Sequence, residues 1–115
     1  MTGQEQRKHR RFGVEVAAEV TIDGDVLIAS TQNLSSGGAA LVLEREVSDG
    51  ASLEVTLFLT QDGIEDPEEE PFEATAQVMW GAPRDDDYYA VGVQFRDIDG
   101  DQQALLGRFL AAVAE

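Results

Sequence analysis

Five consecutive residues near the N-terminus, 7–11, carry the clearest potential for binding chemistry in this sequence. They read Arg-Lys-His-Arg-Arg and hold four of the eight basic residues of the chain. The first eleven residues contain one acid, Glu5, whereas the whole chain has a formal net charge of −15. Guanidinium groups bind phosphate and the edge of guanine with two parallel hydrogen bonds. The segment therefore indicates a local anion site, with a solubilising, disordered terminus as the alternative.

The length and composition indicate how many domains the chain forms and whether it enters a membrane. The 115 residues and 43% hydrophobic content are typical of one folded domain, expected over residues 12–115, with residues 1–11 as a flexible basic arm. No residue stretch has the length and hydrophobicity of a membrane span, and no signal peptide opens the chain. We therefore expect a soluble cytoplasmic protein without membrane insertion, and a monomer.

Several activities are excluded by residue type. The chain has no cysteine and one histidine, His9, so thiolate chemistry and a zinc site built on cysteine or histidine are ruled out. No nucleophile–base pair or acid–base constellation stands out. The sequence predicts that the protein is not an enzyme and holds no metal or cofactor. Its acidity also argues against general affinity for nucleic acid.

Alternating apolar residues predict strands in six segments: 12–22, 26–32, 39–43, 53–59, 72–80 and 88–95. The fifth segment has an expected inward face, consisting of Phe72, Ala74, Ala76, Val78 and Trp80. Turn residues separate the segments, as at Asp23-Gly24-Asp25. Six short strands of this kind predict a mainly β fold, a six-stranded antiparallel β-barrel.

The last segment, 99–114, has the pattern of an amphipathic helix. Asp99 is a suitable N-cap, and Gln102 stands three residues later, as a capping box requires. An apolar stripe follows at helical spacing, formed by Leu105, Leu106, Phe109, Leu110 and Val113. We expect this stripe to cover the barrel or one of its mouths.

Two polar segments interrupt the strand pattern. Residues 33–38 read Asn-Leu-Ser-Ser-Gly-Gly, which is typical of a turn and lacks the Lys-Ser/Thr of a phosphate-binding P-loop. Residues 60–71 form an acidic stretch that contains three consecutive glutamates. We expect this stretch to be a solvated loop, with a docking surface for a basic partner as the alternative.

Two of these signals together resemble a known family. Arg7-x-x-x-Arg11, followed by Asn33-x-Ser35-x-x-Gly38, is similar to the two-part signature of PilZ domains, which are bacterial receptors for the second messenger cyclic di-GMP. The strings at 76–80 and 92–95 also resemble later strands of the family. The resemblance extends over nearly the whole chain, and it implies a PilZ-like barrel with a C-terminal helix.

The resemblance implies a ligand-binding role for five residues. Arg7 and Arg11 would clamp phosphate or guanine, and Asn33 and Ser35 would supply neutral donors and acceptors to a base or to the ring. Gly38 would leave room for the ligand beside the backbone.

Further contacts are expected around these five residues. Lys8 and Arg10 would add positive charge. Trp80 is expected in the core or the barrel wall, with a ligand contact as the alternative. Gln6 stands where many family members have another arginine, a position associated with binding of one ligand or a stacked pair, so the stoichiometry stays open.

The resulting functional hypothesis is a stand-alone PilZ domain that binds cyclic di-GMP and relays the signal to an unidentified effector protein. One alternative is a PilZ-fold adaptor, related to motility or pilus assembly, that does not bind the nucleotide. A barrel that binds single-stranded nucleic acid is disfavoured by the net charge of −15.

Overall fold

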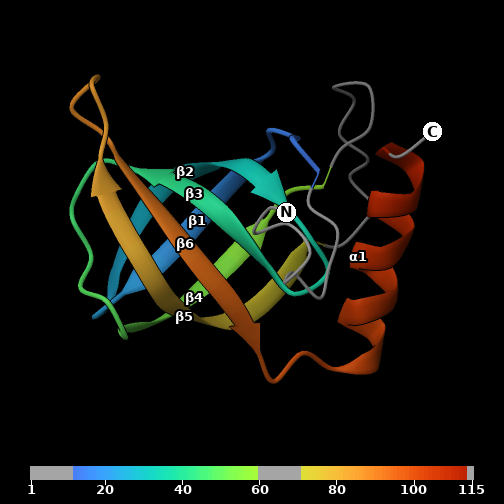
Figure 1. Ribbon diagram of the computed structural model, residues 1–115. Helices are drawn as coiled ribbons and strands as arrows, with labels where there is room; N and C mark the ends of the chain where they lie inside the picture. The colour runs from blue at the N-terminus through green and yellow to red at the C-terminus, as the bar shows by residue number, and fades with distance from the viewer. Residues whose placement is uncertain (1–11, 60–70, 114–115) are drawn as a thin grey trace, which may run out of the picture.

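The computed structural model describes residues 12–59 and 71–113. Within these ranges the chain forms a closed antiparallel barrel with the strand order β1-β2-β3-β6-β5-β4, followed by one helix (Figure 1). The elements are β1 (Ala17–Ile22), β2 (Asp25–Leu34), β3 (Gly38–Leu43), β4 (Ser52–Leu57), β5 (Phe72–Pro83), β6 (Tyr89–Arg96) and α1 (Gly100–Val113). The predicted fold class is confirmed.

The barrel interior is filled by the alternating apolar residues that the sequence pattern placed inward. The most deeply buried of them come from all six strands and include Val20, Leu34, Leu41, Val55, Leu57, Phe72 and Val91. The rings of Phe72 and Phe95 lie 5.1 Å apart between their centroids, in a tilted arrangement that aromatic pairs favour. This packing stabilises the register between neighbouring strands, which in turn sets the positions of the side chains on the outside of the barrel.

The turn between β1 and β2 follows the predicted chemistry. Asp23 and Gly24 both have positive φ angles, 52° and 86°, as a tight two-residue hairpin turn requires. The hairpin pairs Ile22 with Asp25 and continues to the pair Ala17–Ser30. Its register turns Val26 and Ile28 of β2 toward solvent.

Helix α1 begins after the predicted cap. The N–H of Gln102 donates to Asp99 Oδ1 at 2.8 Å, which confirms the N-cap. The reciprocal half of the capping box is absent, because Gln102 Oε1 accepts a hydrogen bond from the backbone N–H of Glu73 at 2.7 Å. This bond ties the helix to β5, and the helix stands across the end of the barrel at which β5 begins, with Leu106, Phe109 and Leu110 buried (Figure 1).

The fifth strand departs from the predicted alternation at its end. The register of β5 against β6 shifts between Val78, which pairs with Val93, and Trp80, which pairs with Gly92. The shift inserts one residue, Met79, and reverses the face on which the following residue points. Trp80 is therefore 45% exposed on the outside of the barrel, and its predicted place on the inward face with Phe72 was wrong.

No helix in the described ranges is both long enough and apolar enough to traverse a lipid bilayer.

Candidate functional site

The chain enters the barrel beside the end of β2. The backbone N–H of Phe12 donates to the carbonyl of Leu34, and the N–H of Leu34 donates to the carbonyl of Phe12, both at 2.9 Å. Leu34 belongs to the polar motif predicted from the sequence, and Phe12 directly follows the basic segment. Of that segment, Arg7, Lys8, Arg10 and Arg11 lie outside the described residues, as does the expected flexibility of residues 1–11. The structure thus fixes the root of the arm next to the motif.

A buried threonine holds this root in place. The Thr31 side chain is 2% exposed; its hydroxyl accepts a hydrogen bond from the Val16 N–H at 2.9 Å and donates to the Val14 carbonyl at 2.7 Å. These bonds replace regular strand pairing before β1, so β1 begins at Ala17 and not at Phe12. Thr31 was not among the residues predicted from the sequence to be functional, although a polar residue at an inward position of a predicted strand indicates a buried hydrogen bond.

The motif folds as a hairpin turn between β2 and β3. Strand β2 extends through Asn33 and Leu34, two residues further than predicted. The Ser35 hydroxyl accepts from the N–H groups of Gly37 and Gly38 and donates to the Gly38 carbonyl, each at 3.2 Å. A hydroxyl has one donor and two acceptor sites, so these bonds use its full capacity. Ser35 is also only 3% exposed, and the structure therefore places its hydroxyl inside the turn.

Gly38 lies against the backbone of β6. A Cβ built at this position would collide with the carbonyl oxygen of Val93 and would stand 3.3 Å from Gln94 Cα. The family resemblance implies that Gly38 leaves room for a ligand beside the backbone. In the structure the absence of a side chain at Gly38 also permits the close approach of β3 and β6.

The outer face of the barrel carries Asn33 and Trp80 in one cross-strand row. Asn33 of β2 pairs with Ala40 of β3, Ala40 pairs with Gly92 of β6, and Gly92 pairs with Trp80 of β5. Paired residues in antiparallel strands point to the same face. Three strand spacings separate the ends of the row, about 14 Å. The amide of Asn33 and the indole of Trp80 therefore stand at the two ends of the row, and the small residues Ala40 and Gly92 lie between them.

Gly92 provides the place in which the indole lies. A Cβ at Gly92 would collide with Trp80 Nε1 and Cε2 and would stand 2.8 Å from Cδ1. The ring consequently occupies the space that a side chain at position 92 would need, while Trp80 stays 45% exposed. An aromatic plane held on the surface in this way can stack on a nucleobase.

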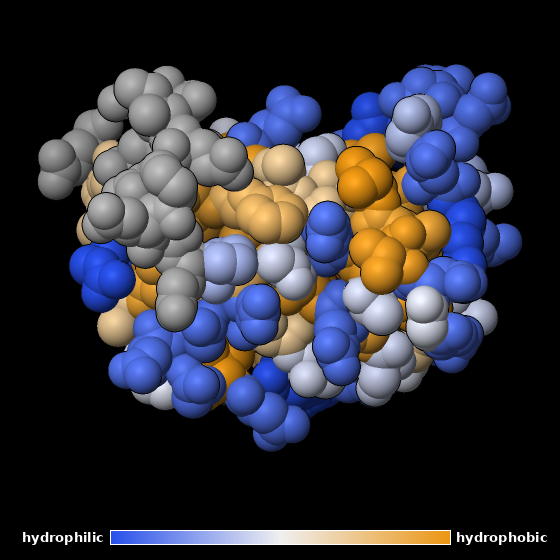
Figure 2. All heavy atoms as spheres, turned by 180° about the vertical axis from the view of Figure 1, so that it is seen from behind, coloured by the Kyte–Doolittle hydropathy of each residue, from blue (hydrophilic) through white to orange (hydrophobic). Residues whose placement is uncertain are grey.

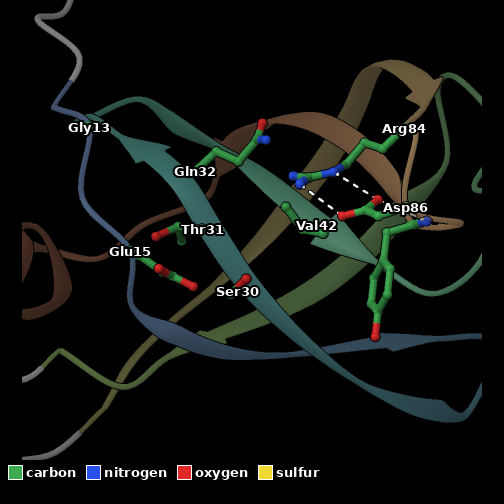
Figure 3. Close-up of a pocket in the computed structure, with 9 residues that line it drawn as sticks. Gly13, Glu15, Ser30, Thr31, Gln32, Val42, Arg84 and Asp86 are labelled. Carbon is green, nitrogen blue, oxygen red and sulfur yellow. Dashed lines mark hydrogen bonds and ion pairs between the residues drawn. The ribbon is translucent and has the colours of Figure 1, made fainter.

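A groove of about 540 Å³ adjoins this row (Figure 3). Its lining residues come from the root of the arm, the middle of β2 and β3, and the β5–β6 loop: Gly13, Glu15, Ser30, Thr31, Gln32, Val42, Arg84, Asp86 and Tyr88. Ser30 pairs with Val42, so the two outward side chains form part of the floor. In Figure 3, Arg84 and Gln32 extend toward each other from opposite sides of the groove.

Arg84 is fixed by a bidentate ion pair with Asp86. Its Nε donates to Asp86 Oδ1 at 3.2 Å and its Nη2 donates to Oδ2 at 3.0 Å. Desolvation would raise the pKa of Asp86, but the hydrogen bonds from Arg84 and from the Tyr88 N–H, together with the charge of Arg84, outweigh it and lower that pKa. The lowered pKa favours the ionised carboxylate, which accepts both hydrogen bonds from the guanidinium.

Among residues 12–59 and 71–113, no group of three or more histidine, aspartate or glutamate side chains is arranged to hold a metal ion. The turn aspartates Asp23 and Asp25 lie on the exposed hairpin instead. The described site offers an aromatic ring, neutral polar groups, one arginine and the carboxylates of Glu15 and Asp86.

Comparison with known proteins gives the family. A model of the PilZ domain matches residues 5–112, which include both the basic segment and the motif. The chain is a PilZ domain. The resemblance read from the sequence is thus confirmed. No curated protein matches the chain.

Solved structures share the fold at low sequence identity. The PilZ domain of YcgR from Escherichia coli, solved with c-di-GMP, aligns with a TM-score of 0.75 at 16% identity, over 95% of this chain and 92% of that chain. MotI/DgrA, an inhibitor of motility from Bacillus subtilis, aligns with a TM-score of 0.76 at 18% identity, over 95% and 51%. The MrkH–c-di-GMP complex from K. pneumonia has a TM-score of 0.71 at 20% identity, over 94% and 51%. This PilZ chain thus spans about half the length of the last two proteins.

Proposed function

We propose that this PilZ domain is a receptor for cyclic di-GMP that acts through a partner protein and has no catalytic activity of its own. One observation carries the proposal. The reciprocal hydrogen bonds between Phe12 and Leu34 place the residue that follows the basic segment next to Asn33. Asn33 is one end of the cross-strand row that we call the Asn33 row, which consists of Asn33, Ala40, Gly92 and Trp80. Family membership supports it, as does the likeness to PilZ structures solved with c-di-GMP.

The arm would supply most of the positive charge of the site, since Arg84 is the one cation among the described residues that line the groove. Arg11 is bonded to Phe12, and Arg7 is five residues away, within a reach of about 18 Å. Both can therefore reach the row between Asn33 and Trp80. Their guanidinium groups would bind phosphates or the O6/N7 edge of guanine, while Lys8 and Arg10 add charge.

The barrel would supply neutral contacts to the bases. Asn33 can hydrogen-bond a base or the ring of the nucleotide, and the indole of Trp80 can stack on a guanine. We assign Ser35 and Gly38 to positioning, because the Ser35 hydroxyl is saturated within the turn and Gly38 faces the backbone of β6. In this assignment both residues act by holding Asn33 in the row.

The relay to a partner would use the outside of β2. The side chains of Val26 and Ile28 are 60% and 71% exposed, and Figure 2 shows a group of hydrophobic side chains on the outer surface of the barrel. The facing residue of β1 opposite Ile28 is Glu19, and Asp25 precedes Val26. Because the six described strands form a closed barrel, none of them has an edge open for pairing. A partner with apolar and basic side chains would fit this surface.

Titration calorimetry with cyclic di-GMP tests the nucleotide half of the proposal. We expect saturable binding that is lost in the Arg7→Ala, Arg11→Ala double variant. Equal heats for the two proteins would contradict the proposal. A wild-type protein that does not bind would favour the alternative function, a PilZ-fold adaptor that works by protein contact alone.

Photo-crosslinking tests the relay. A photoreactive residue at Ile28 should form cross-links in cells that depend on cyclic di-GMP. The matched control is the same residue at Met79, which is 52% exposed on β5. Identical patterns from the two positions would contradict a partner surface on β2.

A further inference from the structure

The groove beside the Asn33 row contains a cation that the family signature does not include. Arg84 lies on the β5–β6 loop, and its backbone N–H donates to the Tyr88 carbonyl at 2.8 Å, which closes that hairpin. Trp80, Ala82 and Arg84 follow one another at two-residue spacing along the same strand and its continuation. Trp80 and Ala82 pair with Gly92 and Ala90 of β6, so this series runs along the outer face toward the groove.

The ion pair with Asp86 leaves part of the Arg84 guanidinium available. A guanidinium has five N–H donors, and Asp86 takes one from Nε and one from Nη2. No described residue accepts a hydrogen bond from Nη1. The side chain of Arg84 is 34% exposed, and Figure 3 shows its guanidinium end directed across the groove toward Gln32. Asp86 thus occupies the edge of the guanidinium formed by Nε and Nη2, and the edge formed by Nη1 and Nη2 stays available.

The charges of the groove indicate which part of a nucleotide this edge would meet. Glu15 and Asp86 line the same groove as Arg84, and Arg84 is the one cation among its described lining residues. Two carboxylates oppose the approach of a negatively charged phosphodiester group. They do not oppose the neutral O6/N7 edge of guanine, which accepts two parallel N–H donors from arginine.

We propose that Arg84 is a third arginine of the nucleotide site, which reads the edge of one guanine, and that Asp86 is its positioning residue. This inference rests on the proposed binding of cyclic di-GMP. It extends the site from the Asn33 row into the groove, toward Gln32 and Arg84, which Figure 3 shows on its two sides. The β5–β6 loop would then contribute to the choice of base.

Calorimetry with cyclic di-GMP at 0.15 M and 0.5 M salt tests the role of Arg84. We expect Arg84→Ala to bind about tenfold more weakly at both salt concentrations, since it loses a bidentate base contact, which salt screens less than a long-range charge effect. Arg84→Lys, which keeps the charge and can keep the pair with Asp86, should not restore binding. The matched control is Arg45→Ala, since Arg45 is paired with Asp25 at 3.4 Å on another part of the surface.

Three results would overturn the role of Arg84. One is wild-type affinity in Arg84→Ala. Another is a loss that disappears at 0.5 M salt or is matched by Arg45→Ala, because it would show a general charge effect. The third is full recovery in Arg84→Lys. If the wild-type protein itself binds no nucleotide, the proposed function fails together with this inference; if only the Arg84 variants behave like wild type, the inference fails alone.

A double-mutant cycle tests the positioning role of Asp86. Asp86→Ala should weaken binding in the wild-type background and have no further effect in the Arg84→Ala background, since Asp86 would act only through Arg84. Tighter binding by Asp86→Ala would show that the carboxylate only repels the ligand, and the positioning role would be wrong. Equal losses in both backgrounds would also contradict it.

Discussion

The indole of Trp80 lies over Gly92, its cross-strand partner on the outside of the barrel. The contact exists because the bulge at Met79 turns Trp80 outward and because Gly92 has no side chain. A ring held in this way is partly exposed and has a fixed plane. The bulge in β5 and the glycine in β6 together place an exposed aromatic ring in the same cross-strand row as Asn33.

Replacing Gly92 by alanine should disturb this surface with little effect on stability. The new methyl group would displace the indole, which is the end of a side chain on the surface, so we expect the free energy of unfolding to change by less than about 1 kcal/mol. Cyclic di-GMP binding should weaken as much as in Trp80→Ala, by about 1–3 kcal/mol. Urea unfolding and calorimetry measure the two effects. Unchanged binding in both variants would show that the indole does not contact the ligand.

Replacing Gly38 by alanine should have a different result. Here the obstacle is the Val93 carbonyl, a backbone atom that cannot rotate away. We expect a loss of unfolding free energy of about 1–3 kcal/mol. Gly13→Ala is the matched control, since nothing lies within 4 Å of a Cβ at that position. Equal stability of the two variants in urea would contradict the close approach of β3 and β6.

Thr31→Val should loosen the root of the arm. The change keeps the shape of the side chain but removes the partner of the Val16 N–H and of the Val14 carbonyl. We expect a loss of about 1–3 kcal/mol of unfolding free energy, with faster amide exchange at Val16. Ser30→Ala, on the adjacent outward position, should change stability by less than about 0.5 kcal/mol. A Val16 amide that exchanges as slowly as in the wild type would argue against the role of this hydroxyl.

The Arg84–Asp86 pair predicts a pH dependence with a definite sign. The pKa of Asp86 is lowered from its ordinary 3.8, so the pair stabilises the folded chain above the unfolded-state pKa and is lost as the pH falls through the folded-state value. NMR titration of the Asp86 carboxyl carbon should give a midpoint below 3.8 in the wild type. The midpoint should rise in Arg84→Ala. Identical midpoints in the two proteins would exclude Arg84 as the cause.

The sequence predicted the barrel well because its signal is the alternation of buried and exposed residues. Inward residues such as Val20, Val55 and Val91 are buried as expected, and Asp99 caps the helix. The end of β5 was predicted wrongly at Trp80, because a bulge changes the face without changing the composition of the segment.

The site was only partly predictable for a related reason. The motif drew attention to Asn33, Ser35 and Gly38, but residue type alone cannot tell a ligand contact from a turn hydrogen bond or a close strand approach. The row that brings Asn33 and Trp80 to one face depends on pairing across four strands. The ion pair between Arg84 and Asp86 depends on the conformation of a loop, and loops have no regular alternation of buried and exposed residues from which a contact could be predicted.

The central claim is that the arm rooted at Phe12 and the row from Asn33 to Trp80 bind cyclic di-GMP together. Calorimetric titration of the wild-type protein, Arg11→Ala and Arg108→Ala tests it most directly, since Arg108 is a surface arginine of helix α1. We predict saturable binding by the wild type and by Arg108→Ala, and a loss of about 2 kcal/mol or more in Arg11→Ala. The fitted stoichiometry would show whether one nucleotide or a stacked pair binds. Binding that is equal in all three proteins, or absent from the wild type, would contradict the claim.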